Sequence, residues 1–305
     1  MSPVGRKGIF SQNMRVATIQ VPNVLKAGCS GVEQFYACVE TALPADCYAL
    51  DMRAVDFVRP YGVIALTTAA RRLSLRSGRP VLLGGVCREV SAYLHRMDLF
   101  ELEAEWLQLA TPIDETWLRS DQTENLLELT AIKDAQSVAA VMTRAKRIFS
   151  RWLALSELGN LLSVLGELCA NIYQHSQDPY GCVLIQKYEL AAGKRVIVNL
   201  AVGDIGCGIR GSLSARHGSI GATPLDYLKA AMSGTTARGT GRGGLGLRTV
   251  EQIAASRGGY LWLRSETAAI FSKGSGNTRE HTDLVHIPGT QVAVQLHAPA
   301  SPQTL

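Results

Sequence analysis

The alternation of apolar and polar residues predicts strands and helices in succession through the first third of the chain. Apolar and polar residues alternate over residues 15–21, and short apolar runs occur at residues 47–52 and 80–83. Between and after these runs, apolar residues recur at helical spacing over residues 62–75 and 90–97. Strands separated by helices are typical of α/β domains, so we expect mixed strands with crossover helices here.

A polar stretch separates this pattern from a second one. Residues 111–125 are more polar than their neighbours and contain Pro112, so we place a domain boundary near residue 120. A chain of 305 residues is also long enough for two domains. We therefore expect a tail at residues 1–13, a first domain at 14–110, a linker at 111–121, a second domain at 122–298 and a tail at 299–305.

The second domain is predicted to begin with a strand at residues 126–132 and two amphipathic helices. Asp134 and Ser156 are the expected capping residues of these helices, which run to about residues 152 and 175. Later elements are expected as strands at 183–188, 196–202, 260–264 and 291–296, with a helix at 245–257. The polar segment 272–283 is predicted to be an exposed loop.

Composition is typical of a globular protein without a membrane-spanning segment. Hydrophobic residues make up 47% of the chain, yet no run reaches about 18 apolar residues. The first residues include basic groups but no apolar core of the kind a secretory signal needs. The 7 cysteines include no pair at C-x-x-C spacing, which disfavours a zinc site and suits a reducing compartment. We therefore expect a cytoplasmic protein that does not enter a membrane.

Glycine and positive charge are concentrated together in the second domain. Of the 29 glycines, 12 lie in the 44 residues from Gly203 to Gly246. Residues 210–242 contain 5 basic residues and 1 acid, whereas the whole chain has a net charge of only +5. Such a mild overall charge argues little for nucleic-acid binding, but glycines beside arginines favour a phosphate site. We expect no nucleic-acid partner.

Three polar residues share one face of the helix expected over residues 157–175. Glu167, Asn171 and His175 follow one another at four-residue spacing, off a stripe of apolar residues. The Asn171 carboxamide offers a neutral oxygen to a magnesium ion, and the Glu167 carboxylate can hold or deprotonate a water. On a single helix the same pattern is more often a solvated polar face.

Two glycine-rich segments follow this helix. In Asp204-x-Gly206-x-Gly208, after a predicted strand, the carboxylate can accept a hydrogen bond from an exocyclic amine, and the glycines let the backbone approach a flat ring. Residues 239–248 open a helix with many glycines, so that successive N–H groups and the helix dipole favour anionic oxygens. Arg242 or Arg248 would add positive charge there.

These segments, in this order, resemble the GHKL ATPases, the family of gyrase, Hsp90, histidine kinases and MutL. Glu167-x-x-x-Asn171 is similar to the family's N box, and Asp204-x-Gly206-x-Gly208 is similar to its adenine motif. Gly241-x-Gly243-Gly244-Leu245-Gly246-Leu247 is similar to its phosphate loop, and Gly289-Thr290 to its late Gly-Thr. The resemblance covers about residues 122–298. The Glu-x3-Asn-x3-His pattern that ends at His175 is most similar to the anti-sigma-factor serine kinases.

The resemblance implies an ATP-binding α/β sandwich, with a mixed sheet and helices on one face. Asn171 would ligate Mg²⁺, Glu167 would be the general base, and Asp204 would bind the adenine amino group, assisted by Thr290 through a water. Residues 210–238 would form a lid over the triphosphate. The other nucleotide-binding positions implied are Gly206, Gly208, Ile209, Gly241, Arg242, Gly243, Gly244, Leu245, Gly246 and Leu247.

The first domain has a resemblance of its own. Residues 49–63, ALDMRAVDFVRPYGV, are similar to the signature of STAS domains, the anti-sigma-factor antagonists, and the similarity covers about residues 14–110. Those antagonists are phosphorylated on a serine in an Asp-Ser-Ser-Gly turn. Here the turn reads Arg59-Pro60-Tyr61-Gly62, so Tyr61 replaces the acceptor serine. We therefore expect a regulatory or docking module with a mixed sheet, one that can contact the ATPase half within the chain.

The two resemblances together imply an ATP-dependent serine/threonine kinase in bacterial partner switching, whose partner is a sigma factor or an antagonist-like regulator. The alternative is an ATP-gated binding module without kinase activity; Glu167 favours chemistry, because gripping a nucleotide needs no base. A dinucleotide-binding enzyme is a weaker rival. Residues 206–211 and 239–244 both fit G-x-G-x-x-G, but that function leaves Glu167 and Asn171 without a role. The partner, the phosphorylated residue and homodimer formation stay open.

Overall fold

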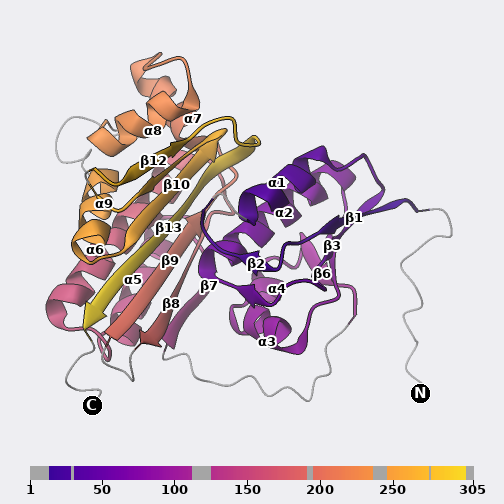
Figure 1. The fold of residues 1–305 in the computed structure, drawn as a ribbon, viewed down its shortest axis with the longest axis horizontal. Helices are drawn as coiled ribbons and strands as arrows, with labels where there is room; N and C mark the ends of the chain where they lie inside the picture. The colour runs from indigo at the N-terminus through magenta and orange to yellow at the C-terminus, as the bar shows by residue number, and fades with distance from the viewer. Residues whose placement is uncertain are drawn as a thin grey trace.

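The protein is a mixed α/β structure, as the sequence predicts, with one main sheet in each half of the chain (Figure 1). The computed structural model describes residues 14–28, 31–111, 125–190, 195–235, 246–274 and 276–299. No helix within these ranges has the length and apolar character needed to cross a membrane.

The N-terminal sheet is parallel throughout its described strands. Its strand order is β1-β3-β5-β6, and each neighbouring pair is parallel. These strands are β1 (Val16–Gln20), β3 (Cys47–Asp51), β5 (Val81–Gly84) and β6 (Leu107–Leu109). Between them lie α1 (Val32–Thr41), α2 (Pro60–Ser77), α3 (Arg88–Arg96), α4 (Leu99–Leu102) and a small parallel ribbon of β2 (Val24–Leu25) with β4 (Phe57–Val58). The prediction of mixed strand directions is wrong for these residues, because helical crossovers rather than hairpins join the strands.

The C-terminal sheet is antiparallel throughout. Its seven strands lie in the order β12-β11-β10-β13-β9-β8-β7, and all neighbouring pairs run antiparallel. The strands are β7 (Leu126–Ala131), β8 (Cys182–Leu190), β9 (Arg195–Gly203), β10 (Tyr260–Glu266), β11 (Ala268–Ser272), β12 (Thr278–His281) and β13 (Ile287–Pro299). The predicted mixed sheet is therefore wrong here as well. The loop predicted at 272–283 contains β12, a polar edge strand whose sequence has no apolar alternation.

Helices α5 (Ala135–Phe149), α6 (Leu155–Asn171) and α9 (Gly246–Ser256) contribute to the core on one face of this sheet. Asp134 caps α5 as predicted and accepts a hydrogen bond from the Ser137 amide at 2.7 Å. The predicted cap at Ser156 is wrong, because α6 already begins at Leu155. Beyond α6 the chain continues in a π-helical turn, Ile172–Ser176. Two helices that the sequence patterns did not predict, α7 (Gly208–His217) and α8 (Pro224–Ser233), follow β9.

Both faces of the seven-stranded sheet are buried, each by a different part of the chain. Side chains alternate along β9, so Leu200 and Val202 face the α5, α6 and α9 layer, whereas Ala201 belongs to the core shared with the N-terminal half. Helix α2 contacts β8, β9 and β13 on that second face. The helices of the C-terminal half thus lie on one face of its sheet, as expected, and a helix of the N-terminal half, which the sequence did not predict there, covers the other face (Figure 1).

Candidate functional site

A cavity with about 790 Å³ of open space lies between α6, α7, α9 and the helical face of the sheet. This volume includes the open space at the mouth of the cavity. Apolar side chains of the sheet, Val202, Leu263 and Val292, line part of it. The predicted site residues among its lining are Glu167, Asn171, Asp204, Gly208, Ile209, Gly246, Leu247 and Thr290.

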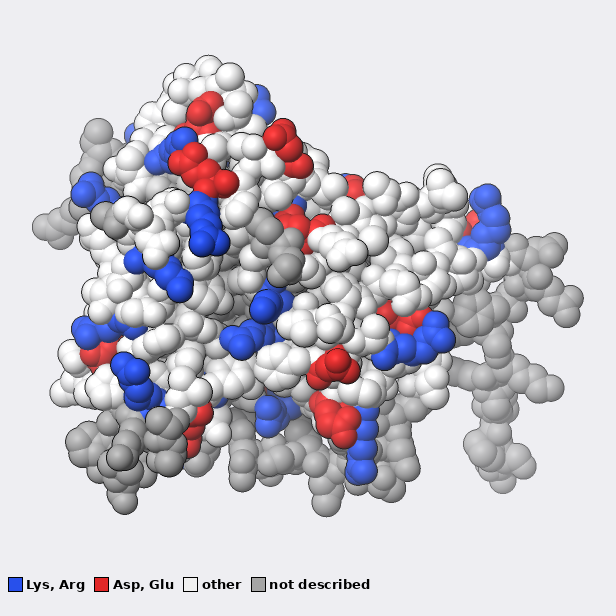
Figure 2. All heavy atoms as spheres, in the orientation of Figure 1, with Lys and Arg blue, Asp and Glu red and all other residues white. Residues whose placement is uncertain are grey.

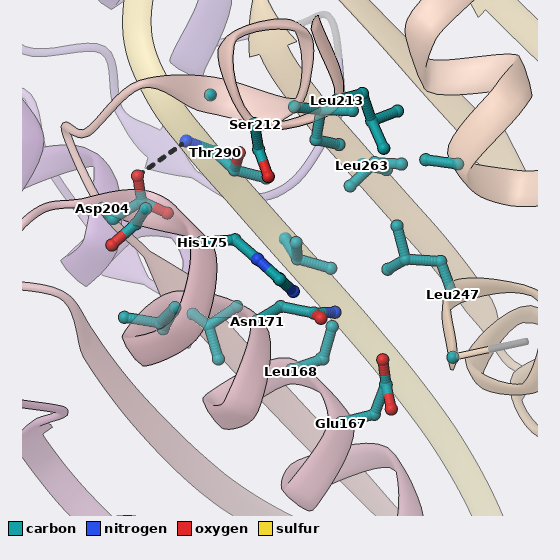
Figure 3. Close-up of a pocket in the computed structure, with 18 of the residues that line it drawn as sticks. Glu167, Leu168, Asn171, His175, Asp204, Ser212, Leu213, Leu247, Leu263 and Thr290 are labelled. Atoms are coloured by element: carbon teal, nitrogen blue, oxygen red, sulfur yellow. Dashed lines mark hydrogen bonds between the residues drawn. The ribbon is translucent and has the colours of Figure 1, made fainter. Parts of the chain in front are cut away.

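Helix α6 and the π-helical turn after it supply one wall of the cavity. Leu161, Leu165 and other apolar residues on the opposite side of α6 are buried in the core, which turns the polar side towards the cavity. Glu167, Asn171 and His175 all line it. Figure 3 shows them in a row that starts near Asp204 with His175, continues through Asn171 and ends at Glu167.

Asp204 lies directly after β9 and is only 4% exposed. Its Oδ1 atom accepts hydrogen bonds from the amides of Gly206 at 2.9 Å and Thr290 at 3.3 Å. Burial raises the pKa of this carboxyl to about 7, because desolvation disfavours its charged form and the nearby Asp178 adds repulsion. The cavity therefore has a hydrogen-bonding carboxyl group at one end, on a loop joined to β13 (Figure 3).

Glycine is required around Asp204 because the backbone passes too close for a side chain. A Cβ atom at Gly206 would overlap the Ser176 carbonyl, and one at Gly289 would overlap the Asp204 carbonyl. Gly206 does not line the cavity; it holds the loop behind it. Gly208 begins α7 with a positive φ of 66°, in the left-handed region that favours glycine.

The first residue of α9 meets the other end of the row. A Cβ atom at Gly246 would overlap the Glu167 carboxylate, so the helix start and this side chain are in direct contact. A carboxylate near a helix N-terminus is favoured by the helix dipole. The predicted phosphate-loop residues Gly241, Arg242, Gly243, Gly244 and Leu245 lie outside the described residues; Gly246 and Leu247 line the cavity.

The segment predicted as a basic lid is largely helical in its described part. Helices α7 and α8 contact each other, and Asp226 completes a capping box with Thr223 at the start of α8. Lys229 forms an ion pair with Glu280 at 2.8 Å, so the positive charge of this segment is partly compensated from β12. Figure 2 likewise shows basic side chains interspersed with acidic ones over the visible face.

Two residues that hold the loop carrying Asp204, Ser265 and Asp178, were not predicted from the sequence. Ser265 on β10 donates a hydrogen bond to the Gly289 carbonyl at 2.8 Å and accepts one from the Ile209 amide at 3.1 Å. Asp178 accepts a hydrogen bond from the Ile205 amide at 2.8 Å. All three bonds join segments far apart in sequence, which no local motif reveals.

The oxygen donors in the cavity fit a magnesium ion that arrives with a phosphate ligand. Among the described residues no three His, Cys, Asp or Glu side chains gather into a metal site. Mg²⁺ commonly keeps several waters and takes only one or two protein ligands beside phosphate oxygens. Asn171, with Glu167 one turn away on the same wall, is suited to that type of coordination.

Comparison with protein-family models and with curated protein sequences found no match.

Proposed function

We propose that the C-terminal half is a GHKL-type ATP-binding domain and that the protein is a serine/threonine kinase of the anti-sigma-factor type. One observation carries the proposal: Glu167 and Asn171 line the same cavity as Asp204, with Asp204 at one end of the row and Glu167 at the other. The elongated arrangement suits a nucleotide whose base lies at Asp204 and whose phosphates lie towards Glu167.

The fold of each half supports this proposal. An antiparallel sheet with α5, α6 and α9 on one face is compatible with an α/β sandwich, and the cavity lies within the helical layer. The parallel N-terminal sheet with its crossover helices is compatible with a STAS-like module. Partner switching by such a kinase, with a sigma factor or an antagonist-like regulator as partner, belongs to the same proposal.

In the proposed reaction, the residues of α6 act on a phosphoryl group passing from ATP to a partner's hydroxyl. Glu167 would accept the proton of that hydroxyl as ADP leaves, and Asn171 would hold a Mg²⁺ ion. The ion would supply charge neutralisation to the phosphates. Asp204 orients the nucleotide by accepting a hydrogen bond from the adenine amino group, and the α9 N-terminus offers its dipole to the phosphates.

The dinucleotide-binding alternative is weakened by the sheet. A dinucleotide fingerprint lies in a βαβ unit of parallel strands. Here β9, which precedes the glycines at 206–211, pairs antiparallel with both β8 and β13. The other alternative is a module that binds ATP without transferring its phosphoryl group. A variant of Glu167, the proposed general base, separates this alternative from the proposed kinase.

Glu167→Gln removes the proposed base while keeping the size of the side chain. We expect phosphotransfer or ATP turnover to fall by about 100-fold or more, because general bases contribute on that scale. We expect the Kd for Mg-ATP to change by less than about threefold, because Glu167 acts on the proton of the acceptor hydroxyl and does not bind the adenine ring. Phosphosite mapping on partners captured with ATP would identify the acceptor.

The matched control is Glu157→Gln on the same helix. Glu157 forms an ion pair with Arg257 at 2.9 Å and does not line the cavity, so this variant should keep its turnover. Unchanged turnover in Glu167→Gln would exclude this residue as the base. ATP binding by the wild type without any turnover or transfer would favour the binding module.

A further inference from the structure

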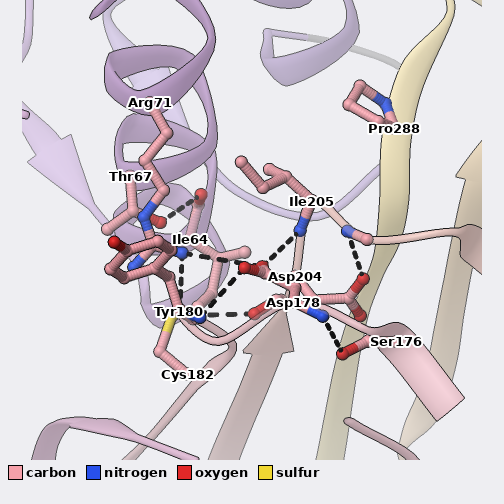
Figure 4. Close-up of polar contacts among 12 residues, drawn as sticks. Ile64, Thr67, Arg71, Ser176, Asp178, Tyr180, Cys182, Asp204, Ile205 and Pro288 are labelled. Carbon is pink, nitrogen blue, oxygen red and sulfur yellow. Dashed lines mark hydrogen bonds and ion pairs between the residues drawn. The ribbon is translucent and has the colours of Figure 1, made fainter. Parts of the chain in front are cut away.

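Arg71 is a buried arginine of α2 that reaches from the N-terminal half into the C-terminal half (Figure 4). Within its own half, its Nε donates a hydrogen bond to Glu103 at 2.8 Å, and a second guanidinium nitrogen completes a two-pronged ion pair. Across the interface, Nη1 donates to the Tyr180 carbonyl at 2.5 Å and lies 3.9 Å from the Asp178 carboxylate. The guanidinium also lies over the Tyr180 ring, 5.5 Å from its centre.

Asp178 connects this arginine to the loop that carries Asp204. Its Oδ2 atom, the one nearest Arg71, accepts the hydrogen bond from the Ile205 amide at 2.8 Å. Its Oδ1 atom accepts one from the Tyr180 amide at 2.9 Å. Because Ile205 follows Asp204 directly, the position of the Asp178 carboxylate determines where the peptide next to Asp204 is held (Figure 4).

Helix α2 also contacts the other side of the same loop. The Ile64 side chain packs against Gly203, where a Cβ atom would overlap it. Gly203 directly precedes Asp204, so Ile64 of α2 contacts the chain just before Asp204. Through Arg71 and Asp178, α2 also holds the chain just after Asp204. Ile64, Thr67 and Arg71 lie on one face of α2, at the spacing of successive helical turns (Figure 4).

We propose that Arg71 is a positioning residue that, through Asp178, holds the Asp204 loop in the geometry that distinguishes adenine from guanine. The inference rests on the proposed function and extends it, because base selectivity in the C-terminal cavity then depends on a residue of the N-terminal half. The N-terminal half is therefore part of the nucleotide site without touching the nucleotide.

The physical reason is the cost of a buried carboxylate without its counter-charge. Removing one partner of a buried ion pair leaves the other uncompensated, and the structure responds by admitting water, moving or taking up a proton. Each of these responses moves the Asp178 carboxyl group or weakens its hydrogen bond from the Ile205 amide, and so loosens the loop beside Asp204. Adenine presents an amino donor where guanine presents a carbonyl acceptor, so discrimination depends on the position of the Asp204 acceptor. Sites built on such hydrogen bonds lose selectivity when the donor and acceptor no longer meet.

The test uses the full chain and compares Arg71→Met with Arg72→Met. Arg72 is the next residue on α2 and pairs with Glu40 of α1 at 3.0 Å, entirely within the N-terminal half. The Kd values for Mg-ATP and Mg-GTP are measured for each protein by calorimetry, and their ratio reports base selectivity. We expect the wild type to prefer ATP, Arg71→Met to lose at least tenfold of that preference, and Arg72→Met to stay within about twofold of the wild type.

A second variant keeps the test decisive if Arg71→Met does not fold. Asp178→Asn has the same shape but one acceptor oxygen fewer, and we expect the same loss of selectivity with Arg71 intact. A general loss of stability would weaken both nucleotides equally and leave the ratio unchanged.

The outcomes separate the two proposals. If the wild type binds neither nucleotide, the proposed function fails and this inference fails with it. If the wild type prefers ATP and the folded variants keep its ratio, the positioning role of Arg71 is overturned while the proposed function stands. Equal binding of ATP and GTP by the wild type would also overturn the inference.

Discussion

At the scale of single residues, the carboxyl group of Asp204 is buried in the folded protein and also lines the candidate binding cavity. It is buried at the end of β9, where burial raises its pKa to about 7. In the unfolded chain an aspartate ionises near pH 3.9. Between about pH 4 and pH 7 the folded protein therefore holds a proton that the unfolded chain has released. The contribution of Asp204 to stability therefore falls as the pH rises through this window and stays level above it.

Asp204→Asn should reveal this linkage. The amide oxygen can still accept the hydrogen bonds from Gly206 and Thr290, but it never ionises. The variant's free energy of unfolding, relative to the wild type without nucleotide, should rise between pH 4 and pH 7 by up to about 4 kcal/mol, then level off. Urea unfolding followed by circular dichroism at several pH values measures this difference.

Asp226, in the capping box that opens α8, is the control. Hydrogen bonds from Thr223 lower the pKa of its carboxyl group. Relative to the wild type, Asp226→Asn should therefore lose stability only as the pH rises towards about 4, and the difference should stay level between pH 4 and pH 7. A stability difference for Asp204→Asn that did not vary with pH would show that this carboxyl group is not buried as described.

The candidate site residues differ in how far the sequence could predict them. Helical periodicity is local, so the sequence alone could predict that Glu167, Asn171 and His175 share a face. In the structure they line one cavity. Arg71 and Asp178 were not, because their meeting depends on how the two halves pack. The sequence does show Arg71 within an apolar helix, but that pattern is also compatible with an exposed side chain.

At the scale of elements, the sequence predicted those with strong apolar patterns and missed those without. Strands β3 and β9 and helix α2 were found close to their observed bounds. Strand β12 was missed because it is a polar edge strand, and α7 and α8 because the glycines around them suggested a loop. Strand direction was wrong in both sheets, since apolar alternation carries no information about which strands become neighbours.

Helix α1 joins the two halves through a second buried ion pair. Glu33 receives two hydrogen bonds from Arg264, at 2.8 and 3.1 Å, and Arg264 is fully buried on β10. This guanidinium also donates to the Val285 carbonyl at 2.6 Å and lies over the Tyr36 ring. The pair fixes α1 against β10 of the C-terminal sheet.

Glu33→Ala should lower the free energy of unfolding by about 3–5 kcal/mol, because it leaves Arg264 buried without its carboxylate. Glu40→Ala on the same helix is the comparison. Glu40 bridges Arg72 and Arg76 near the surface, where the expected loss is about 1 kcal/mol or less. Urea unfolding of both variants measures the two losses, and equal small losses would show that the interface ion pair contributes little.

At the scale of the whole molecule, the two halves form one structure rather than two modules on a tether. Their side chains share a hydrophobic core, and Tyr61 accepts a hydrogen bond from the Trp262 indole at 2.9 Å within it. Tyr61, at the turn where the STAS resemblance has its acceptor serine, is only 3% exposed. Removing the N-terminal half would uncover a whole face of the seven-stranded sheet, so point variants at the interface are better tests than deletion.

Calorimetric titration of the full chain with Mg-ATP decides whether this sequence encodes an ATP site. The arrangement of Asp204, Asn171 and Glu167 in one cavity predicts saturable binding of a single nucleotide, with ATP preferred over GTP. Absence of binding at millimolar Mg-ATP would exclude the proposed ATP site.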